Sequence, residues 1–308
     1  TVIIAGTCTG FVSNRIIRDV EFDYVIVDEA AKATFPELAV SLNRAHKIIL
    51  VGDHQQLPPV LDTEIIKNNK EKLNEESLSQ GIFERMYNMF PEENKHRLTI
   101  QYRMHPTIGT LISHVFYNDE IQNGVEAKDR DLAIEGYEGI AVEWISTSKY
   151  LDKDRFEKEF DNNGKKSYQN YLERNIIERK LLELDSKLDK KTKAAVITGY
   201  GAQKYILQTM VKQHSFKNLE IDVDTVDAFQ GSQKDIILYS TVRSSGNKYG
   251  IGFLKSEARI NVAFSRAKCL LIIVGDMKFL DNYRIRGNKF PQIIKYISEF
   301  EGCRIIEK

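Results

Sequence analysis

The sequence is poor in cysteine, lacks long apolar runs and carries no excess charge of either sign. Its three cysteines, Cys8, Cys269 and Cys303, are far apart and lack metal-ligand spacing, which argues against a disulfide framework or a zinc site. The longest apolar runs are strand-sized, so the sequence predicts no membrane span. Lysine plus arginine and aspartate plus glutamate number 44 each, so any contact with nucleic acid must come from a local groove. We expect buried, reduced thiols and a cytoplasmic location.

A further absence is the phosphate-binding loop G-x-x-x-x-G-K-[ST]. In proteins that have this loop, its backbone N–H groups, lysine and hydroxyl hold the nucleotide phosphates and Mg²⁺. The sequence also starts at Thr1, with neither a methionine nor a signal peptide. Other motifs typical of nucleotide-driven proteins are present. We therefore expect the missing loop to lie in an upstream part of the same polypeptide.

What is present is an alternation of short β-rich runs and helical patterns. This alternation predicts an α/β fold with mostly parallel sheets, and 308 residues are enough for two domains. Ligands bind at the carboxyl ends of parallel strands in such sheets, so we expect the motifs at that edge. The expected strands are Val2–Ala5, Tyr24–Val27, Lys47–Val51, Leu98–Ile100, Ile140–Trp144, Ala194–Thr198, Ile221–Thr225, Ile236–Thr241 and Leu270–Val274.

A densely charged segment interrupts the alternation at about residues 147–166. It offers little to bury, so we expect a surface insertion. Directly after it, Asn170 and Glu173 have the spacing of a reciprocal helix cap, in which each side chain bonds the backbone of the other. An apolar stripe beginning at Ile176 follows and predicts a helix.

Two adjacent carboxylates, Asp28 and Glu29, follow the apolar run that ends at Val27. One carboxylate there can hold a hydrated Mg²⁺, since this ion keeps several waters and takes one or two protein carboxylates. The other can orient or deprotonate an attacking water. The alternative is a strand followed by an acidic helix start, and an isolated Asp-Glu pair favours that alternative.

A stiff polar loop, Gly52–Val60, follows the next apolar run. Gln56 in this loop can donate to a phosphate oxygen and accept from a water, as a sensor of a terminal phosphate must. The alternative is an ordinary strand-exit turn stiffened by Pro58 and Pro59.

Two arginines, Arg103 and Arg266, are candidates for binding a phosphoryl group in transfer. Both are permanently charged forks that match the geometry of phosphate oxygens. Tyr102 offers a flat face on which a purine can stack. Taken singly, each arginine is better explained by a surface salt bridge and Tyr102 by core packing, so only their order and neighbours favour the phosphate role.

Their order along the chain resembles the carboxyl-terminal part of a superfamily 1 helicase of the up-frameshift type. The motifs that carry the resemblance are Asp28-Glu29-Ala30, Gly52-Asp53-His54, Gln101 to Pro106, Phe116-Tyr117 with Gln122-Asn123-Gly124-Val125, Thr225 to Gly231, Gly250 to Leu254, and Arg259 to Arg266.

The resemblance implies how the hydrolytic residues act. Asp28 would ligate Mg²⁺, Glu29 would activate water and Gln56 would sense the γ-phosphate of ATP. Arg103 and Arg266 would reach the same phosphate from the second domain. An arginine of this kind is worth roughly 10³ to 10⁵ in rate.

The resemblance also implies nucleotide contacts, with two local departures. Tyr102 would stack on adenine, and Asp53, Gly231 and Gln233 would complete the site. The family usually has a glutamate at position 233 to bond the ribose, and the amide keeps an acceptor but loses the charge. Gly199 replaces a proline that is common in the family.

A path for single-stranded DNA or RNA is implied as well, contacted mostly through phosphates. Thr7, Thr198 and Thr225 match positions where hydroxyls and backbone amides hold the strand. Threonine at a strand end is also common for structural reasons. Binding through hydroxyls and amides would fit the neutral net charge.

The predicted architecture is therefore two tandem RecA-like domains with mostly parallel sheets. Residues 1–96 form the first domain, incomplete at its N-terminal side, and residues 97–308 form the second. The implied activity is ATP-dependent 5′ to 3′ translocation and unwinding, absent from this segment alone because it lacks the phosphate loop. Two alternatives remain: a translocase that does not unwind duplexes, and an inert nucleic-acid-binding or interaction module.

Overall fold

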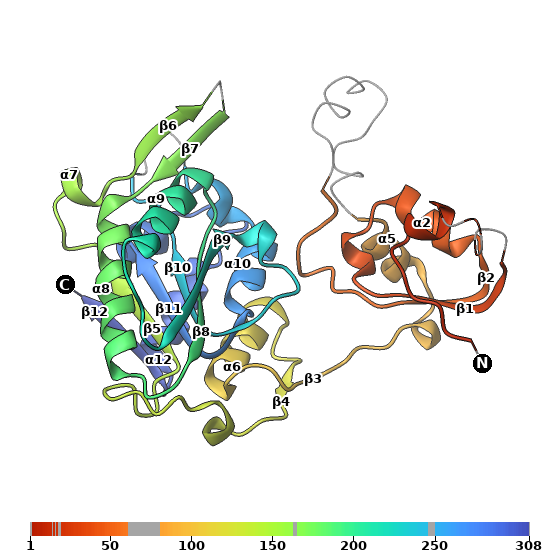
Figure 1. Cartoon of the computed structure of the whole chain (residues 1–308), viewed down its shortest axis with the longest axis horizontal. Coiled ribbons are helices and arrows are strands. Elements are labelled where there is room, and N and C mark those ends of the chain that lie inside the picture. Colours follow the sequence, from red (N-terminus) through yellow and green to blue (C-terminus); the bar gives the residue numbers. More distant parts are fainter. Residues whose placement is uncertain are drawn as a thin grey trace. The chain divides into compact units, whose positions relative to one another are not determined.

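The computed structural model describes residues 2–13, 15, 17, 20–60, 81–162, 165–245 and 250–307. The chain divides into two compact units, Thr1–Arg97 (unit 1) and Leu98–Lys308 (unit 2) (Figure 1). Among the described residues, no helix has the length and apolar character needed to cross a membrane.

Unit 1 is small and is built around two parallel strands. The strands pair from Phe22 with Ala45 to Val27 with Leu50. Its described elements are α1 (Gly10–Ser13), β1 (Phe22–Val27), η1 (Ala30–Lys32), α2 (Phe35–Leu42), β2 (Ala45–Leu50), α5 (Ile82–Met89) and η2 (Glu92–Asn94).

The core of unit 1 lies where the helices meet the ends of the strands. Val27, Ala30, Leu38 and Phe83 are buried together there. The expected strand Val2–Ala5 is wrong, because this segment has no ladder partner among the described residues and its side chains are mostly exposed.

Unit 2 holds a larger sheet with helices on both faces (Figure 1). Its elements are β3 (Ile100–Gln101), α6 (Pro106–Phe116), β4 (Gln122–Asn123), η3 (Ala127–Arg130), β5 (Val142–Ser146), α7 (Asp152–Arg155), β6 (Lys158–Asn162), β7 (Lys165–Gln169), α8 (Tyr171–Lys187), β8 (Thr192–Thr198), α9 (Gly201–Lys212), β9 (Leu219–Thr225), η4 (Val226–Ala228), β10 (Lys234–Ser240), η5 (Gly252–Lys255), α10 (Glu257–Phe264), β11 (Ala267–Gly275), α11 (Met277–Asn282), α12 (Phe290–Glu299) and β12 (Cys303–Glu307).

The large sheet has the order β12-β5-β11-β10-β8-β9, and every pairing in it is parallel. Alternate side chains of its central strands point to opposite faces, and both faces are covered. Leu238 and Ile272 pack with α8 and α9 on one face. On the other face, Tyr239 packs edge-on against Phe264 of α10. The α/β class with mostly parallel sheets is therefore confirmed.

The charged segment contains regular structure. Its second half begins an antiparallel hairpin of β6 and β7, described except for residues 163 and 164. The expectation that this segment buries little is wrong at the base of the hairpin, where only 1% of the Glu157 side chain is exposed. A short run of charges does not reveal that one of them has a buried arginine as its partner.

Helix α8 begins where the sequence predicts, but only half of the expected cap forms. The Asn170 side chain accepts from the backbone N–H of Glu173 at 3.0 Å. The Glu173 carboxylate does not return to Asn170; it is fully buried and accepts from Ser240 Oγ and from the backbone N–H of Val242. The Glu173 carboxylate, which the local sequence pattern predicts as part of the helix cap, therefore binds the end of β10 and the residue after it instead.

The three cysteines are half-buried rather than buried, and all three are free. Burial raises the pKa of the Cys269 thiol to about 11 and that of Cys303 to about 12. Both thiols therefore stay protonated and unreactive near neutral pH.

Candidate functional site

In unit 1 the candidate carboxylates lie at the carboxyl end of β1. Glu29 has a left-handed backbone conformation, with φ of 54°, and its N–H donates to Asp28 Oδ1 at 2.9 Å. The next N–H, of Ala30, donates to the carbonyl oxygen of Val51 at 2.8 Å, which ties this turn to the end of β2. A positive φ at a non-glycine residue is uncommon and here turns both exposed carboxylates out of the strand.

The polar loop after β2 lies beside this turn. Gly52 is required there because a Cβ would come within 2.7 Å of the backbone nitrogen of Ala31. Asp53 orders the loop, since its carboxylate accepts from Gln56 Nε2 at 2.8 Å and from the N–H of Gln55 at 3.0 Å. The turn after β1 and the loop after β2 therefore meet at one edge of the small sheet, as expected for adjacent parallel strands.

In unit 2 the two candidate arginines meet at Ser265. Arg103 Nη1 donates to the carbonyl oxygen of Ser265 at 3.3 Å, and Arg266 Nη2 donates to Ser265 Oγ at 3.4 Å. Arg266 also donates from Nε to the carbonyl oxygen of Val262 and from Nη1 to that of Ser232. The Arg266 side chain is thus buried and fixed at the end of α10, while Arg103 is half-buried.

The segment that carries Tyr102 and Arg103 is clamped by its neighbours. The Gln101 side-chain oxygen accepts from the N–H groups of Arg103 and Met104. Arg130 donates to the carbonyl oxygens of Tyr102 and Arg103 at 2.7 and 2.8 Å. The ring of Tyr102 lies against Gly124, where a Cβ would collide with it, and remains mostly exposed. The clamp leaves an exposed aromatic ring on a fixed backbone.

The following residue docks this segment on the large sheet. The His105 N–H donates to the carbonyl oxygen of Lys268 in β11. Burial lowers the pKa of His105, so its ring is neutral at pH 7, and its Nδ1 accepts from the N–H of Thr107.

The arginine cluster lies at the opposite edge of the sheet from the one we expected. Arg266 directly precedes β11, and Gly231, Ser232 and Gln233 directly precede β10, so these residues are at the amino ends of the strands. Gly231 has φ of 82° and, like Gln233, is exposed beside the Ser232 carbonyl that Arg266 binds. The rule that ligands bind at the carboxyl ends of parallel strands did not locate these residues. They lie in the connecting segments that follow η4 and α10 and lead into β10 and β11.

The three candidate threonines differ in exposure. Thr7 is exposed, and its Oγ1 accepts from the N–H of Gly10 at the start of α1. Thr198 and Thr225 are paired at the carboxyl ends of β8 and β9. Thr225 is half-buried, whereas Thr198 is fully buried and its hydroxyl has no hydrogen-bond partner among the described residues. A strand can reach the Thr198 hydroxyl only if the side chains over it move.

Four residues of the unit 2 site were not singled out from the sequence. Ser265, Gln101 and Asn123, whose Oδ1 accepts from Gln101 Nε2, lie inside the quoted motifs, so their polar side chains were a usable signal. Arg130 lies outside those motifs, and its partners depend on how the segment after α6 returns to β3. The described residues hold no group of three or more His, Cys, Asp or Glu side chains able to bind a metal.

Comparison with known families gives two matches of the same description. A family model described as an AAA domain matches residues 78–278, and another AAA domain model matches residues 1–64.

Curated proteins match most of the chain. It is 36% identical over 285 residues to a regulator of nonsense transcripts 1 homolog of Drosophila melanogaster, which covers 90% of this chain and 23% of the relative. The ATP-dependent helicase NAM7 of Saccharomyces cerevisiae is 34% identical, with 98% and 30% covered. An uncharacterized ATP-dependent helicase of Methanocaldococcus jannaschii is 32% identical, with 96% and 42% covered. The chain thus spans less than half the length of each.

Among solved structures, that of a PRRSV helicase has a TM-score of 0.39 and 17% sequence identity. It covers 82% of this chain, which spans 34% of that one.

Proposed function

Because the chain belongs to the AAA domain family, in the branch of the up-frameshift superfamily 1 helicases, we propose that the whole protein hydrolyses ATP to move along nucleic acid and unwind it. One observation carries the proposal: Arg103 and Arg266 converge on Ser265, although Arg103 and Ser265 are 162 positions apart. Two positively charged guanidinium groups that meet at one residue repel each other, and an anion such as a phosphate bound to both would offset that repulsion. Movement is 5′ to 3′ by analogy with the family.

In this proposal the hydrolytic residues divide the work. Glu29 orients or deprotonates the attacking water, and Gln56 contacts the γ-phosphate. Arg103 and Arg266 bind the oxygens on which negative charge grows during transfer.

Asp28 is the Mg²⁺ ligand in this proposal. Its exposed carboxylate fits an ion that keeps most of its waters and takes one protein carboxylate, and does not fit an all-protein metal centre. When bound, Mg²⁺ neutralises charge on the β- and γ-phosphates. The chain's own task is to hold this carboxylate in place, which the hydrogen bond from the Glu29 N–H supports.

Nucleotide binding involves residues of both units in the proposal. Tyr102 stacks on the adenine, and its exposed ring on a clamped backbone supports this role. Gly231 and Gln233, exposed beside Arg266, contact the nucleotide, and Asp53 positions Gln56 for it.

Single-stranded DNA or RNA is the proposed substrate strand. Thr7, Thr198 and Thr225 contact its phosphates, with Thr225 the most accessible of the two threonines in unit 2. The few separate cysteines also lead us to place the whole protein in the cytoplasm.

The phosphate-binding loop is proposed to come from an upstream part of the same polypeptide. The exposed apolar side chains of β1 and β2 support this, because a further strand or helix of the same domain would cover them. Without that loop the β- and γ-phosphates lose their main contacts, so we propose that this segment alone does not hydrolyse ATP.

The test is ATPase activity of the whole protein, stimulated by single-stranded nucleic acid, with Glu29→Gln. We expect turnover to fall by at least about 10²-fold with little change in ATP binding, since only the activation of water is lost. Glu21→Gln, which also neutralises an exposed acid of unit 1, is the control. Unchanged turnover in Glu29→Gln would refute the assignment.

Two further measurements separate the alternatives. Strand displacement on a naked duplex distinguishes a helicase from a translocase that only strips proteins. Titration of ATP and of a single-stranded oligonucleotide into this segment tests for an inert module, which would bind nucleic acid weakly or not at all and show no nucleotide-dependent change.

A further inference from the structure

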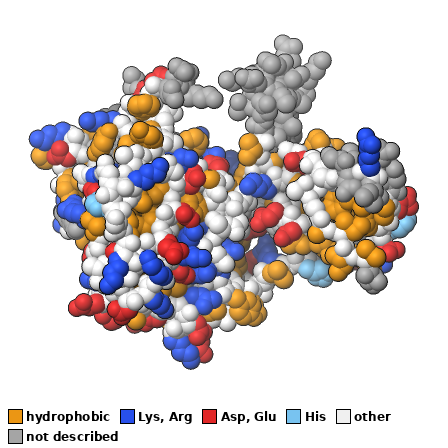
Figure 2. All heavy atoms as spheres, viewed as in Figure 1, with side chains coloured by type: hydrophobic (Ala, Val, Ile, Leu, Met, Phe, Trp, Pro, Cys, Tyr) orange, Lys and Arg blue, Asp and Glu red, His pale blue; other side chains and the backbone are white. Residues whose placement is uncertain are grey.

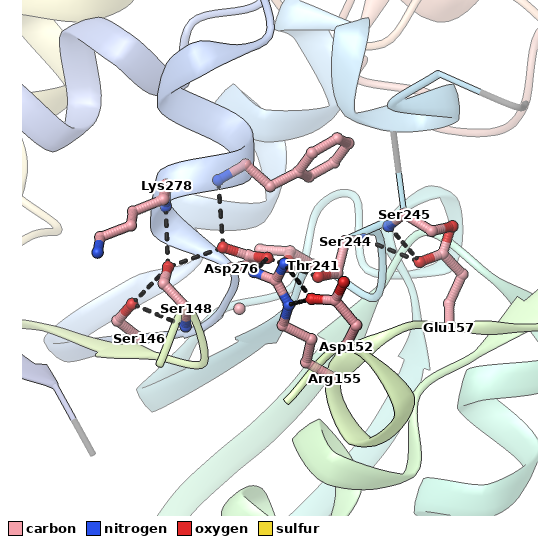
Figure 3. Close-up of polar contacts among 12 residues, drawn as sticks. Ser146, Ser148, Asp152, Arg155, Glu157, Thr241, Ser244, Ser245, Asp276 and Lys278 are labelled. Carbon is pink, nitrogen blue, oxygen red and sulfur yellow. Dashed lines mark hydrogen bonds and ion pairs between the residues drawn. The ribbon is translucent and has the colours of Figure 1, made fainter. Parts of the chain in front are cut away.

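A buried carboxylate outside the proposed sites is held like an anionic ligand. Glu157 Oε2 accepts from the backbone N–H groups of Ser244 and Ser245, both at 2.9 Å. Its Oε1 accepts from Ser245 Oγ at 2.7 Å and faces Arg243 Nε at 3.0 Å. Two adjacent amides, a hydroxyl and a guanidinium thus surround one carboxylate. Figure 3 shows Glu157 beside Ser244 and Ser245. We call the donor segment Arg243–Ser245 the cradle.

The cradle is preformed by contacts that do not involve Glu157. Val242 has φ of 69°, and the N–H of Arg243 closes a tight turn on the carbonyl oxygen of Thr241 at 2.8 Å. A positive φ is strained for a β-branched residue, so the surrounding structure must hold it. Glu173 does so by accepting the Val242 N–H at 2.9 Å.

Three more contacts fix the side chains of Arg243 and Ser244 in the cradle. Arg243 Nη2 donates to the carbonyl oxygen of Gly250, and its guanidinium lies 4.1 Å from the centre of the Tyr168 ring. Ser244 Oγ donates to Asp276 at 2.6 Å. The donor segment is thus held by contacts other than those to Glu157.

The cradle lies at the edge of the sheet that carries the strand-contact residues. It follows β10, whose Ser240 pairs with Thr198 of β8, which in turn pairs with Thr225 of β9. Neighbouring strands are roughly 4.8 Å apart, so the three positions lie in a row about 10 Å long. A polyanion that contacts Thr225 and Thr198 would meet the cradle next.

The base of the hairpin has its own anchor, separate from Glu157. Arg155 Nη1 donates to Asp276 Oδ2 at 2.7 Å, and Asp276 Oδ1 accepts from Ser148 Oγ and from the N–H of Phe279. Figure 3 shows this group to one side of Glu157 and Ser245. Holding the hairpin in place therefore does not require the Glu157 carboxylate.

We propose that the cradle is a phosphate-binding site for the nucleic-acid backbone and that Glu157 is an internal mimic of that phosphate. Adjacent amides, a hydroxyl and an arginine are the donors that proteins use for phosphate oxygens. The carboxylate comes from an insertion 87 positions before Ser244 in the sequence and leaves when a strand phosphate takes its place. The identity of the ligand rests on the proposed function.

The first test compares Glu157→Ala with Glu159→Ala. Glu159 lies in the same hairpin, pairs with Lys166 and accepts from the Tyr168 hydroxyl, so its loss changes the charge equally while the bonds from Ser244 and Ser245 to Glu157 remain. We expect Glu157→Ala to bind a fluorescent single-stranded oligouridylate about tenfold tighter than the unchanged chain. Its log K should fall more steeply with log salt, by about 0.7, for one added phosphate contact. Glu159→Ala should leave both values close to those of the unchanged chain.

The direction of the change in oligouridylate affinity separates a phosphate mimic from a purely structural Glu157. A purely structural Glu157 leaves Arg243 without its charge partner when removed, so binding by Glu157→Ala that is equal or weaker overturns the proposal. If Glu157→Ala does not fold, as judged by fluorescence of the buried Trp144, Glu157→Gln replaces it. Glu157→Gln should bind more tightly than the unchanged chain, and equal or weaker binding again overturns the proposal.

A second test does not depend on nucleic-acid binding. Inorganic phosphate should raise the melting temperature of Glu157→Ala more than that of the unchanged chain or of Glu159→Ala, since only the first has an open cradle. Equal shifts overturn the proposal. If phosphate stabilises Glu157→Ala selectively but no variant binds the oligouridylate, the cradle stands and the proposed function fails. If all variants bind the oligouridylate equally and phosphate has no selective effect, the cradle proposal fails and the proposed function stands.

Discussion

The two units use similar strand sequences but surround them differently. In unit 1, apolar side chains of β1 and β2 are widely exposed, and hydrophobic side chains gather on the surface of this unit in Figure 2. The exposed fraction of Ile26 is 67%. In unit 2, apolar positions of β10 and β11 such as Leu238 and Ile272 are fully buried under α8 and α9, and the other face of the sheet is covered as well. An apolar run that ends in Asp or Gly therefore predicts a strand, but its burial depends on neighbours far away in the sequence.

This difference matters for the candidate site residues. Asp28 and Glu29 extend from unit 1, which has a small core. Arg103 and Arg266 are held by hydrogen bonds on unit 2, which has a large buried core. Local stability increases with the amount of buried apolar contact, so we expect unit 2 to hold its candidate residues more stably than unit 1 holds Asp28 and Glu29. Adding the covering elements should stabilise unit 1 far more than unit 2.

The largest effect expected from this comparison is on core truncation. Ile272→Ala removes a fully buried side chain from the central strand β11 and should cost about 2–5 kcal/mol of unit 2 stability. Ile26→Ala removes the same atoms from an exposed position of β1 and should cost less than about 0.5 kcal/mol. Urea unfolding followed by fluorescence of Trp144, the only tryptophan, reports on unit 2.

Hydrogen exchange at the amides of β1 reports on unit 1 in the same pair of variants. Should Ile26→Ala prove as costly as Ile272→Ala, the β1 face is covered in solution, by a second copy or another part of the chain. The contrast between the units would then be wrong.

A middle-sized effect concerns pH. Burial raises the pKa of Glu173 to about 8, although hydrogen bonds from Ser240 and Val242 favour its charged form. An unfolded glutamate titrates near its usual value of about 4.3, so between these values the native state holds a proton that the unfolded state has lost. The contribution of Glu173 is complete below about pH 4 and is lost as pH rises to 8. Glu173→Gln should flatten this decline in the Trp144 urea midpoint.

Glu183 on the same helix provides the control. Burial raises its pKa, but Lys180 and Lys187 outweigh this and lower it overall. Its contribution is therefore constant from pH 5 to 8 and is lost only at lower pH. Glu183→Gln should keep the slope of the unchanged chain across that window; a slope unchanged in Glu173→Gln would mean that Glu173 is ionised in the native state.

Much of the fold was readable from local pattern. Most strands and the start of α8 lie within a few residues of their predicted positions, because buried parallel strands form unbroken apolar runs. The hairpin β6–β7 and strand β12 were missed, since the first is charged and the second is a short run whose preceding turn signal, Gly302, was not used. Glu173 was misassigned because its partner, the loop after β10, is remote in sequence.

The candidate site was readable in part for the same reason. Motif order singled out Arg103 and Arg266, which the structure brings together at Ser265. It did not reveal that they lie at the amino ends of the strands, opposite to Thr198 and Thr225. The chemical character of a side chain can be read from the local sequence, whereas the end of the sheet at which the side chain lies depends on the topology of the chain.

The smallest effect is expected at a surface cap in unit 1. The Glu37 carboxylate accepts from Thr34 Oγ1 at 2.7 Å and from the Thr34 N–H at 2.8 Å, which lowers the pKa of Glu37. A depressed pKa gives stability above the unfolded value that is lost as pH falls, the opposite sign to Glu173. Thr34→Ala should cost about 0.5–1 kcal/mol at pH 7, and less at pH 3. Faster hydrogen exchange in α2, with the Trp144 transition unmoved, would show that the loss stays within unit 1; a shifted Trp144 transition would mean that the two units unfold together.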